Sequence, residues 1–162
     1  YNPNNDTFYM ITTAFAGGSG NIVVKTKDPM QGWSDPYHLK FNGIDPSLFF
    51  DDDGKAYVVH NDAPDKGKEL YNGHRVIKVW EYDVEKDQVI EGTDKIIVDG
   101  GVDISEKPIW IEAPHLYKKD GKYLRCYIYI WYIYIYIGNC LQYPYIQSEA
   151  LFNVGEGVRG AS

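Results

Sequence analysis

The sequence predicts an all-β fold, a partial β-propeller, on three observations. Short segments rich in β-branched and aromatic residues are separated by turn residues, as strands and their connections are. No long segment ahead of the C-terminal tail has the 3.6-residue apolar period of a helix. The turns also recur at a fixed distance along the chain, which is typical of repeated blades.

The expected strands alternate with tight turns from the first residues onward. In chain order the strands are 8–16 (FYMITTAFA), 21–27 (NIVVKTK), 37–41 (YHLKF), 47–50 (SLFF), 56–60 (AYVVH), 74–84 (HRVIKVWEYDV) and 95–98 (KIIV). Hairpin turns are predicted at Asn5-Asp6, Asp53-Gly54, Asn72-Gly73 and Asp120-Gly121. Gly and Asn are favoured there because they adopt the positive φ that such turns require.

An internal repeat relates two carboxylates. The tripeptide at 53–55 (DGK) recurs at 120–122, an offset of 67 residues, and the same offset relates Asp45 to Glu112. A repeat of this length can hold the four strands of a propeller blade, whose innermost strand faces a central channel. We therefore expect Asp45 and Glu112 to face one channel.

The N-terminal hairpin fits as an earlier blade, and its counterpart of Asp45 and Glu112 would fall before residue 1. With this repeat length the 162 residues make about 2.4 blades, fewer than the roughly four to eight of closed propellers. We expect a chain truncated at both ends.

The chain changes character after Tyr123. We divide it into a partial β-propeller domain, 1–123, and an atypical Tyr/Ile-rich strand with an irregular tail, 124–162. The segment YIYIWYIYIYI has the period of a strand buried on both faces, and it is equally compatible with an irregular or misread coding segment. The tail GEGVRGAS is Gly-rich.

Composition indicates which classes of binding partner the protein favours. The net charge of −7, spread along the chain, disfavours nucleic acid and anionic membranes and suits a neutral substrate. Cys126 and Cys140 have no metal-type spacing and make no disulfide framework. Localisation stays open between secreted or periplasmic and cytoplasmic.

Paired carboxylates are the working groups of most glycoside hydrolases, where one donates a proton and another activates water or attacks the sugar. Glu112 lies within IWIEAPHLY, an apolar, aromatic stretch in which an unpaired charge is costly to bury. An ordinary edge-strand Glu is the alternative. Asp45 precedes a proline, so it is also explained as a turn cap. The repeat that joins the two weakens both alternatives.

Sugar rings stack on aromatic side chains, and Trp110 is the leading candidate because it lies two residues from Glu112 on the expected strand face. His115, three residues after Glu112, would line the same channel. The alternatives are a core tryptophan and a structural histidine. No metal site is predicted, because the histidines lack ligand spacing and the acidic run 51–54 lacks the EF-hand pattern.

Four segments carry a family resemblance over about residues 1–123. They are GGSGNIVVKTKDPMQGWSDP, GIDPSLFFDDDGKAYVVHN, NGHRVIKVWEYD and GGVDISEKPIWIEAPHLYKKDGKY. In this order they resemble glycoside hydrolase family 43, in particular its branch of β-xylosidases and α-L-arabinofuranosidases. The resemblance implies a five-bladed propeller, of which this chain would hold about two and a half blades, and an O-glycosidase that acts with inversion on arabinoxylan-type poly- or oligosaccharides.

The resemblance also implies roles for single residues. Asp45, in IDPS, modulates the pKa and orientation of the acid, and Glu112, in EAPH, is the general acid. The general base is an Asp of the first blade, and no residue here matches it. No cofactor is required, and any structural Ca²⁺ of the complete family fold has no identifiable ligands here. Without a base, a non-catalytic carbohydrate-binding propeller fragment is the alternative function.

Overall fold

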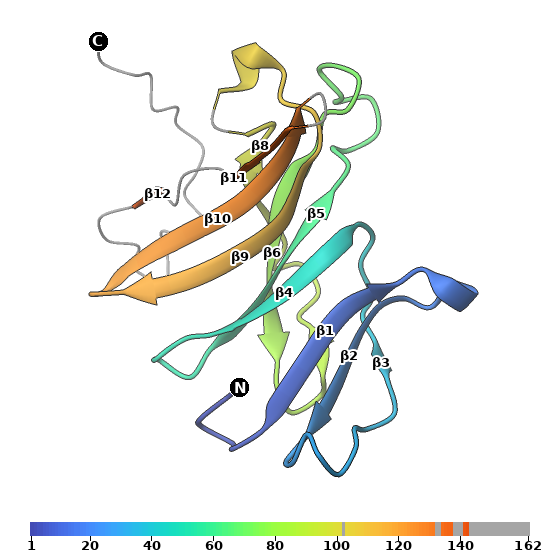
Figure 1. Ribbon diagram of the computed structural model, residues 1–162, viewed down its shortest axis with the longest axis vertical. Helices are drawn as coiled ribbons and strands as arrows, with labels where there is room; N and C mark the ends of the chain where they lie inside the picture. Colours follow the sequence, from blue (N-terminus) through green and yellow to red (C-terminus); the bar gives the residue numbers. More distant parts are fainter. Residues whose placement is uncertain (102, 132–133, 138–140, 143–162) are drawn as a thin grey trace.

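The computed structural model describes residues 1–101, 103–131, 134–137 and 141–142, and within these the chain is folded from β-strands (Figure 1). The strands form three antiparallel sheets. The helical segments of this described part are two 3₁₀ turns, Ala16–Gly18 and Ile104–Glu106. None of its helices has the length and apolarity needed to cross a membrane. The all-β prediction is confirmed.

The first sheet has the order β1-β2-β3, and its strands are β1 (Phe8–Ala14), β2 (Gly20–Thr26) and β3 (Tyr37–His38). The predicted turn at Asn5-Asp6 is present, because an isolated bridge joins Asn2 to Thr7 and Asp6 has a φ of 48°. β1 is an edge strand of this sheet.

The second sheet has the order β4-β5-β6-β7, with β8 also paired to β6. Its strands are β4 (Ile44–Phe50), β5 (Ala56–Asp62), β6 (Val76–Asp83), β7 (Gln88–Val89) and β8 (Lys95–Asp99). A tight turn joins β4 to β5 at Asp53-Gly54, as predicted. The prediction of a hairpin at Asn72-Gly73 is wrong, because this dipeptide forms a local turn, closed by His74 N donating to Tyr71 O at 3.2 Å, inside the long connection from β5 to β6.

The third sheet contains β9 (Ile111–Lys119), β10 (Lys122–Trp131), β11 (Tyr134–Ile137) and β12 (Leu141–Gln142). The turn at Asp120-Gly121 joins β9 to β10, as predicted. In the described part of the Tyr/Ile-rich segment, β10 pairs with β11. β10 also runs across the predicted domain boundary after Tyr123, which stays a prediction, and Cys140 and the tail from 143 lie outside the described residues.

The middle sheet is packed between the other two. Every residue of β5 up to Asn61 is buried, because alternate side chains enter opposite cores. Tyr57 and Val59 pack with Ile111 and Leu116 of β9, whereas the cluster around Ala56 and Val58 contains Val23 of β2. Burial on both faces explains the unbroken apolar run of this strand.

The edge strands of the three sheets follow one another: β4 packs against β1 on one side and against β9 on the other (Figure 1). A buried aspartate ties the middle sheet to each of its two neighbours. Asp51 accepts from Lys118 Nζ and the Tyr123 hydroxyl, and Asp87 accepts from Lys25 Nζ. The sheets are thus held as neighbours by both apolar cores and ionic contacts.

Candidate active site

Asp45 and Glu112 come together where β4 and β9 lie side by side. Each is the second residue of the edge strand of its sheet. The Oδ2 atom of Asp45 accepts a hydrogen bond of 3.1 Å from the backbone N–H of Ala113, the neighbour of Glu112. The next residues are joined as well, because Ser47 Oγ donates to Pro114 O at 2.8 Å. The repeat therefore predicted a pair of carboxylates that the fold does bring together.

The backbone is irregular at both carboxylates. The register of β4 with β5 shifts between Ile44 and Ser47, and that of β9 with β10 shifts next to Glu112. Asp45 has a φ of 54° and Ala113 a φ of 48°, a left-handed conformation that costs about 1–2 kcal/mol in a residue with a Cβ. Such bulges turn a side chain away from the regular alternation, and the surrounding contacts have to hold them in place.

A series of hydrogen bonds from the first sheet holds the backbone of Asp45 in place. The backbone N–H of Asp45 donates to Thr13 Oγ1 at 3.1 Å, and Thr13 Oγ1 donates to Asn21 Oδ1 at 2.7 Å. The buried amide of Asn21 then donates to the carbonyls of Phe41 and Gly43. Thr13 and Asn21 were not predicted as site residues, although a polar Asn21 at the head of the apolar NIVV strand indicates a buried hydrogen-bonding position.

The surroundings of Glu112 favour its protonated form. Partial burial raises the pKa of the Glu112 carboxyl, and the negative charge of Asp45 raises it further. The positive charge of Arg75 opposes both effects and lowers the pKa. The net pKa lies above the usual value for Glu, as a proton donor near neutral pH requires.

Trp110 lies just before β9 and differs from its expected position. Its φ of 53° and its N–H, which donates to Gly73 O at 3.1 Å, set it outside the strand, so alternation along β9 does not place it on the face of Glu112. Its side chain is nevertheless 51% exposed, which leaves a large aromatic surface open to a ligand. Its role in binding stays a prediction.

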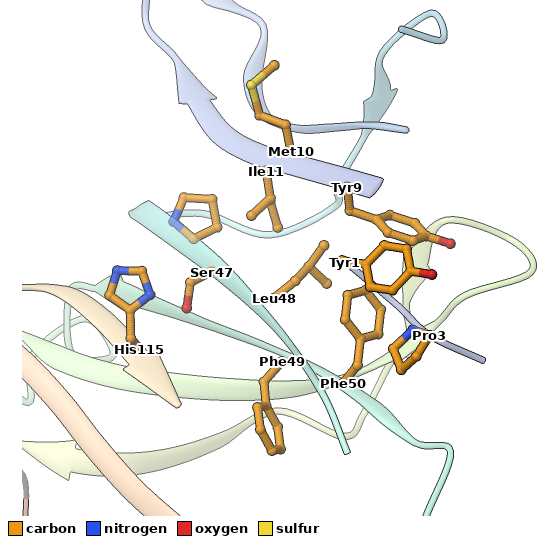
Figure 2. Close-up of a pocket in the computed structure, with 11 residues that line it drawn as sticks. Tyr1, Pro3, Tyr9, Met10, Ile11, Ser47, Leu48, Phe49, Phe50 and His115 are labelled. Carbon is orange, nitrogen blue, oxygen red and sulfur yellow. The ribbon is translucent and has the colours of Figure 1, made fainter. Parts of the chain in front are cut away.

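His115 is exposed on β9 and lines a cavity of about 500 Å³ between β1 and β4. Figure 2 shows Tyr1, Tyr9, Leu48 and Phe50 gathered at one end, with Ser47 and His115 at the other. Asp45 and Glu112 are absent from the residues that line it. His115 therefore opens onto a cavity that neither carboxylate lines, and its role in substrate binding stays a prediction.

A metal ion finds no ligand set in the part of the chain that the structure describes, because no three His, Cys, Asp or Glu residues there are grouped to hold one. The structural Ca²⁺ that the resemblance allows in the complete fold stays a prediction, and we assign it no step.

The chain is similar to known proteins in both sequence and structure. The family model described as glycosyl hydrolases family 43 matches residues 2–138. A xylosidase/arabinosidase from Butyrivibrio fibrisolvens is 47% identical over 123 residues, 74% of this chain and 23% of the relative. The crystal structure of a GH43_12 protein retrieved from capybara gut metagenome is 66% identical with a TM-score of 0.77, over 80% of this chain and 24% of that one. A xylan β-1,4-xylosidase from Bacillus halodurans is 35% identical with a TM-score of 0.57, over 76% and 23%. This chain thus spans about a quarter of the length of these proteins.

Proposed function

Because the chain belongs to glycosyl hydrolase family 43, we propose that it forms part of an inverting glycoside hydrolase that cleaves xylosidic or arabinofuranosidic linkages. The observation that carries the proposal is the half-buried Glu112 carboxyl, whose pKa is raised beside the charge of Asp45. The names of the relatives, a xylosidase/arabinosidase and a xylan β-1,4-xylosidase, support the substrate class. We assign the activity to the complete protein, meaning this chain with any flanking sequence that its gene encodes.

The three sheets correspond to successive blades of a five-bladed propeller, about two and a half of which lie in this chain. The side-by-side packing of the edge strands β1, β4 and β9 supports this arrangement, since the innermost strands of propeller blades line one channel. The sharing of the middle sheet between two apolar cores supports it as well.

In the proposed reaction the protonated Glu112 donates to the glycosidic oxygen of the leaving group. Asp45 raises the pKa of Glu112 through its charge and, by accepting from Ala113 N, fixes the backbone beside the donor. A water molecule attacks the anomeric carbon from the opposite face, helped by a base that in inverting enzymes lies roughly 6.5–9.5 Å from the acid. Trp110 offers its exposed ring to the flat face of a sugar, and His115 borders the adjoining cavity.

Substituting Glu112→Gln in the complete protein tests the acid. Aryl xylosides or arabinofuranosides with poor leaving groups need protonation, so their kcat/KM is expected to fall about 10²–10⁴-fold. Substrates with activated leaving groups need less help and should lose much less. Glu106→Gln, on the exposed 3₁₀ turn ahead of β9, is the matched control. Equal losses for both kinds of substrate, or no loss, would refute the role of Glu112.

A sugar-binding fragment without catalysis is the second candidate, and one observation favours it. Within the described residues, Asp45 is the sole carboxylate whose charge raises the pKa of Glu112, whereas the proposed reaction needs a further group as the base. Isothermal titration of the 162-residue chain with xylo-oligosaccharides, beside a hydrolysis assay, separates the two functions. Binding without turnover by both this chain and the complete protein would favour the binding function.

A further inference from the structure

Arg75 and Asn61 form a hydrogen-bonded bridge that ends at the strand of Glu112. Arg75, just before β6, donates from Nε to Asn61 Oδ1 at 2.7 Å and also from Nη2 to the same oxygen. Asn61, on β5, donates from Nδ2 to the carbonyl of Ile111. Ile111 is fully buried and directly precedes Glu112. The bridge thus links β5, β9 and the residue that precedes β6 through one amide.

Asn61 also lies against the other carboxylate strand. In the ladder of β4 and β5 its partner is Ile44, the residue before Asp45. Asn61 is 0% exposed, so its amide has no water to replace a lost partner. The chain comes very close here, since a Cβ on Gly43 would lie 2.0 Å from Asn61 O. One buried side chain therefore contacts the backbone that leads into Glu112, and its own backbone pairs with the residue that leads into Asp45.

We propose that Arg75 and Asn61 are positioning residues for Glu112: Asn61 fixes the backbone in front of the carboxyl, and Arg75 locks the Asn61 amide while holding a positive charge near that carboxyl. The proposal rests on the proposed function of Glu112 as the proton donor. It assigns Arg75 a second effect beyond structure, because a guanidinium that only braced Asn61 would leave the titration of Glu112 unchanged.

The charges around Glu112 support this role. From β4, Asp45 raises the pKa of Glu112, and from the start of β6, Arg75 lowers it. Within the described residues, no ionisable group of β5 or β6 shifts the pKa of Glu112. Lys78 and Asp62 are paired at 2.9 Å, and burial lowers the pKa of His60 to about 4, which leaves it neutral. Arg75 thus moderates an acid that must both hold a proton and release it.

Two substitutions in the complete protein separate charge from geometry. A general acid works while protonated, so its pKa sets the alkaline limb of the kcat/KM profile against pH. Arg75→Gln removes the charge and should move this limb upward by about 0.5–1 pH unit, less than the roughly 1–3 units expected of a charge in direct contact. Arg75→Lys keeps a charge but loses the two-pronged donor, so kcat should fall about tenfold or less while the limb stays within about 0.2 unit of the wild type.

Lys95→Gln, at an exposed position of β8, removes the same charge far from the bridge and is the matched control. If Arg75→Gln leaves the alkaline limb in place, or if Lys95→Gln moves it equally, the proposal is wrong. A purely structural Arg75 would lower kcat at every pH without moving the limb.

A readout that needs no turnover distinguishes this proposal from the proposed function. Carbon-13 NMR of glutamate-labelled protein follows the Glu112 carboxyl through its titration, with Glu112→Gln identifying the resonance. The midpoint should rise in Arg75→Gln and not in Lys95→Gln. If the wild type hydrolyses none of the substrates but the midpoint rises in Arg75→Gln, the proposed function is wrong and the role of Arg75 beside Glu112 is supported. A midpoint that is unchanged in Arg75→Gln refutes the positioning role of Arg75, whether or not the enzyme is active.

Discussion

The contact of Asp51 with Lys118 and Tyr123 joins the second and third sheets and should contribute about 2–3 kcal/mol to the free energy of unfolding. The carboxylate is 4% exposed and accepts from Lys118 Nζ, from the Tyr123 hydroxyl and, at 2.7 Å, from the N–H of Asp52. These donors lower the pKa of Asp51 against the opposing effect of burial. Asp51→Asn keeps the shape of the side chain and removes its charge.

The expected loss of stability in Asp51→Asn follows from the Lys118 charge that the substitution leaves without its partner. Removing one partner of a buried ion pair costs about 3–5 kcal/mol, because the other charge stays buried and unpaired. The Lys118 side chain is 23% exposed and keeps Asp52 at 3.3 Å, so we expect a cost somewhat below this range, about 2–3 kcal/mol. Urea unfolding of the complete protein, followed by tryptophan fluorescence, measures this loss at pH 7.

The sign of the pH dependence provides a second check. A carboxyl whose folded pKa is depressed contributes stability that is present above its unfolded pKa of about 3.9 and is lost as the pH falls through the folded value. Asp51→Asn should therefore lose less stability than the wild type on acidification below about pH 4. In a double-mutant cycle with Lys118→Met the coupling should exceed about 1 kcal/mol. A coupling near zero, or a loss at pH 7 below about 0.5 kcal/mol, would refute the reasoning.

Two further substitutions test the interior of the middle sheet. His60 is fully buried with a pKa of about 4, below its unfolded value of about 6.5, so stability should fall by about 3 kcal/mol as the pH drops from 6.5 to 4. His60→Asn should flatten that slope in urea unfolding, and because Asp51 titrates below this window, an unchanged slope would contradict the assignment. Gly43→Ala should cost about 3 kcal/mol or more, because its Cβ would lie 2.0 Å from Asn61 O at a φ of +92°. Gly67→Ala, with a φ of +84° and open space, is the control and should cost about 1–2 kcal/mol in the same assay; equal losses would show that the close contact has no effect.

Local turn chemistry made much of the fold predictable. Asp-Gly dipeptides between strand-forming segments correctly placed the turns that join β4 to β5 and β9 to β10. The same logic failed at Asn72-Gly73, where the turn is real but lies within a loop. There Gly73 passes under Ile109, since a Cβ would meet that side chain at 2.9 Å. A turn dipeptide predicts the φ of its own residues, but it does not predict which elements the turn connects.

The supporting residues of the site were not predictable in the same way. Asn61 and Ile111 are fifty residues apart, and Asp45 and Thr13 thirty-two. A polar residue at the end of an apolar strand, such as Asn61 after AYVVH, indicates a buried partner without indicating which one. The carboxylates were found because they recur at a fixed offset, whereas Asn61 and Arg75 have no such recurrence. Only the docking of the sheets brings them to the backbone that precedes Glu112.

Equal positions in the repeat lead to different surroundings for the two carboxylates. In β4 the residue with positive φ is Asp45 itself, but in β9 it is Ala113, one place after Glu112. Asp45 accepts a backbone N–H, an interaction that suits a negative charge. Glu112 has no hydrogen bond to its carboxyl within the described residues, and its raised pKa follows from burial and from the charge of Asp45. A shift of one residue in the bulge thus leaves one carboxylate to supply charge and the other to hold a proton, which is the division of labour that the proposed reaction requires.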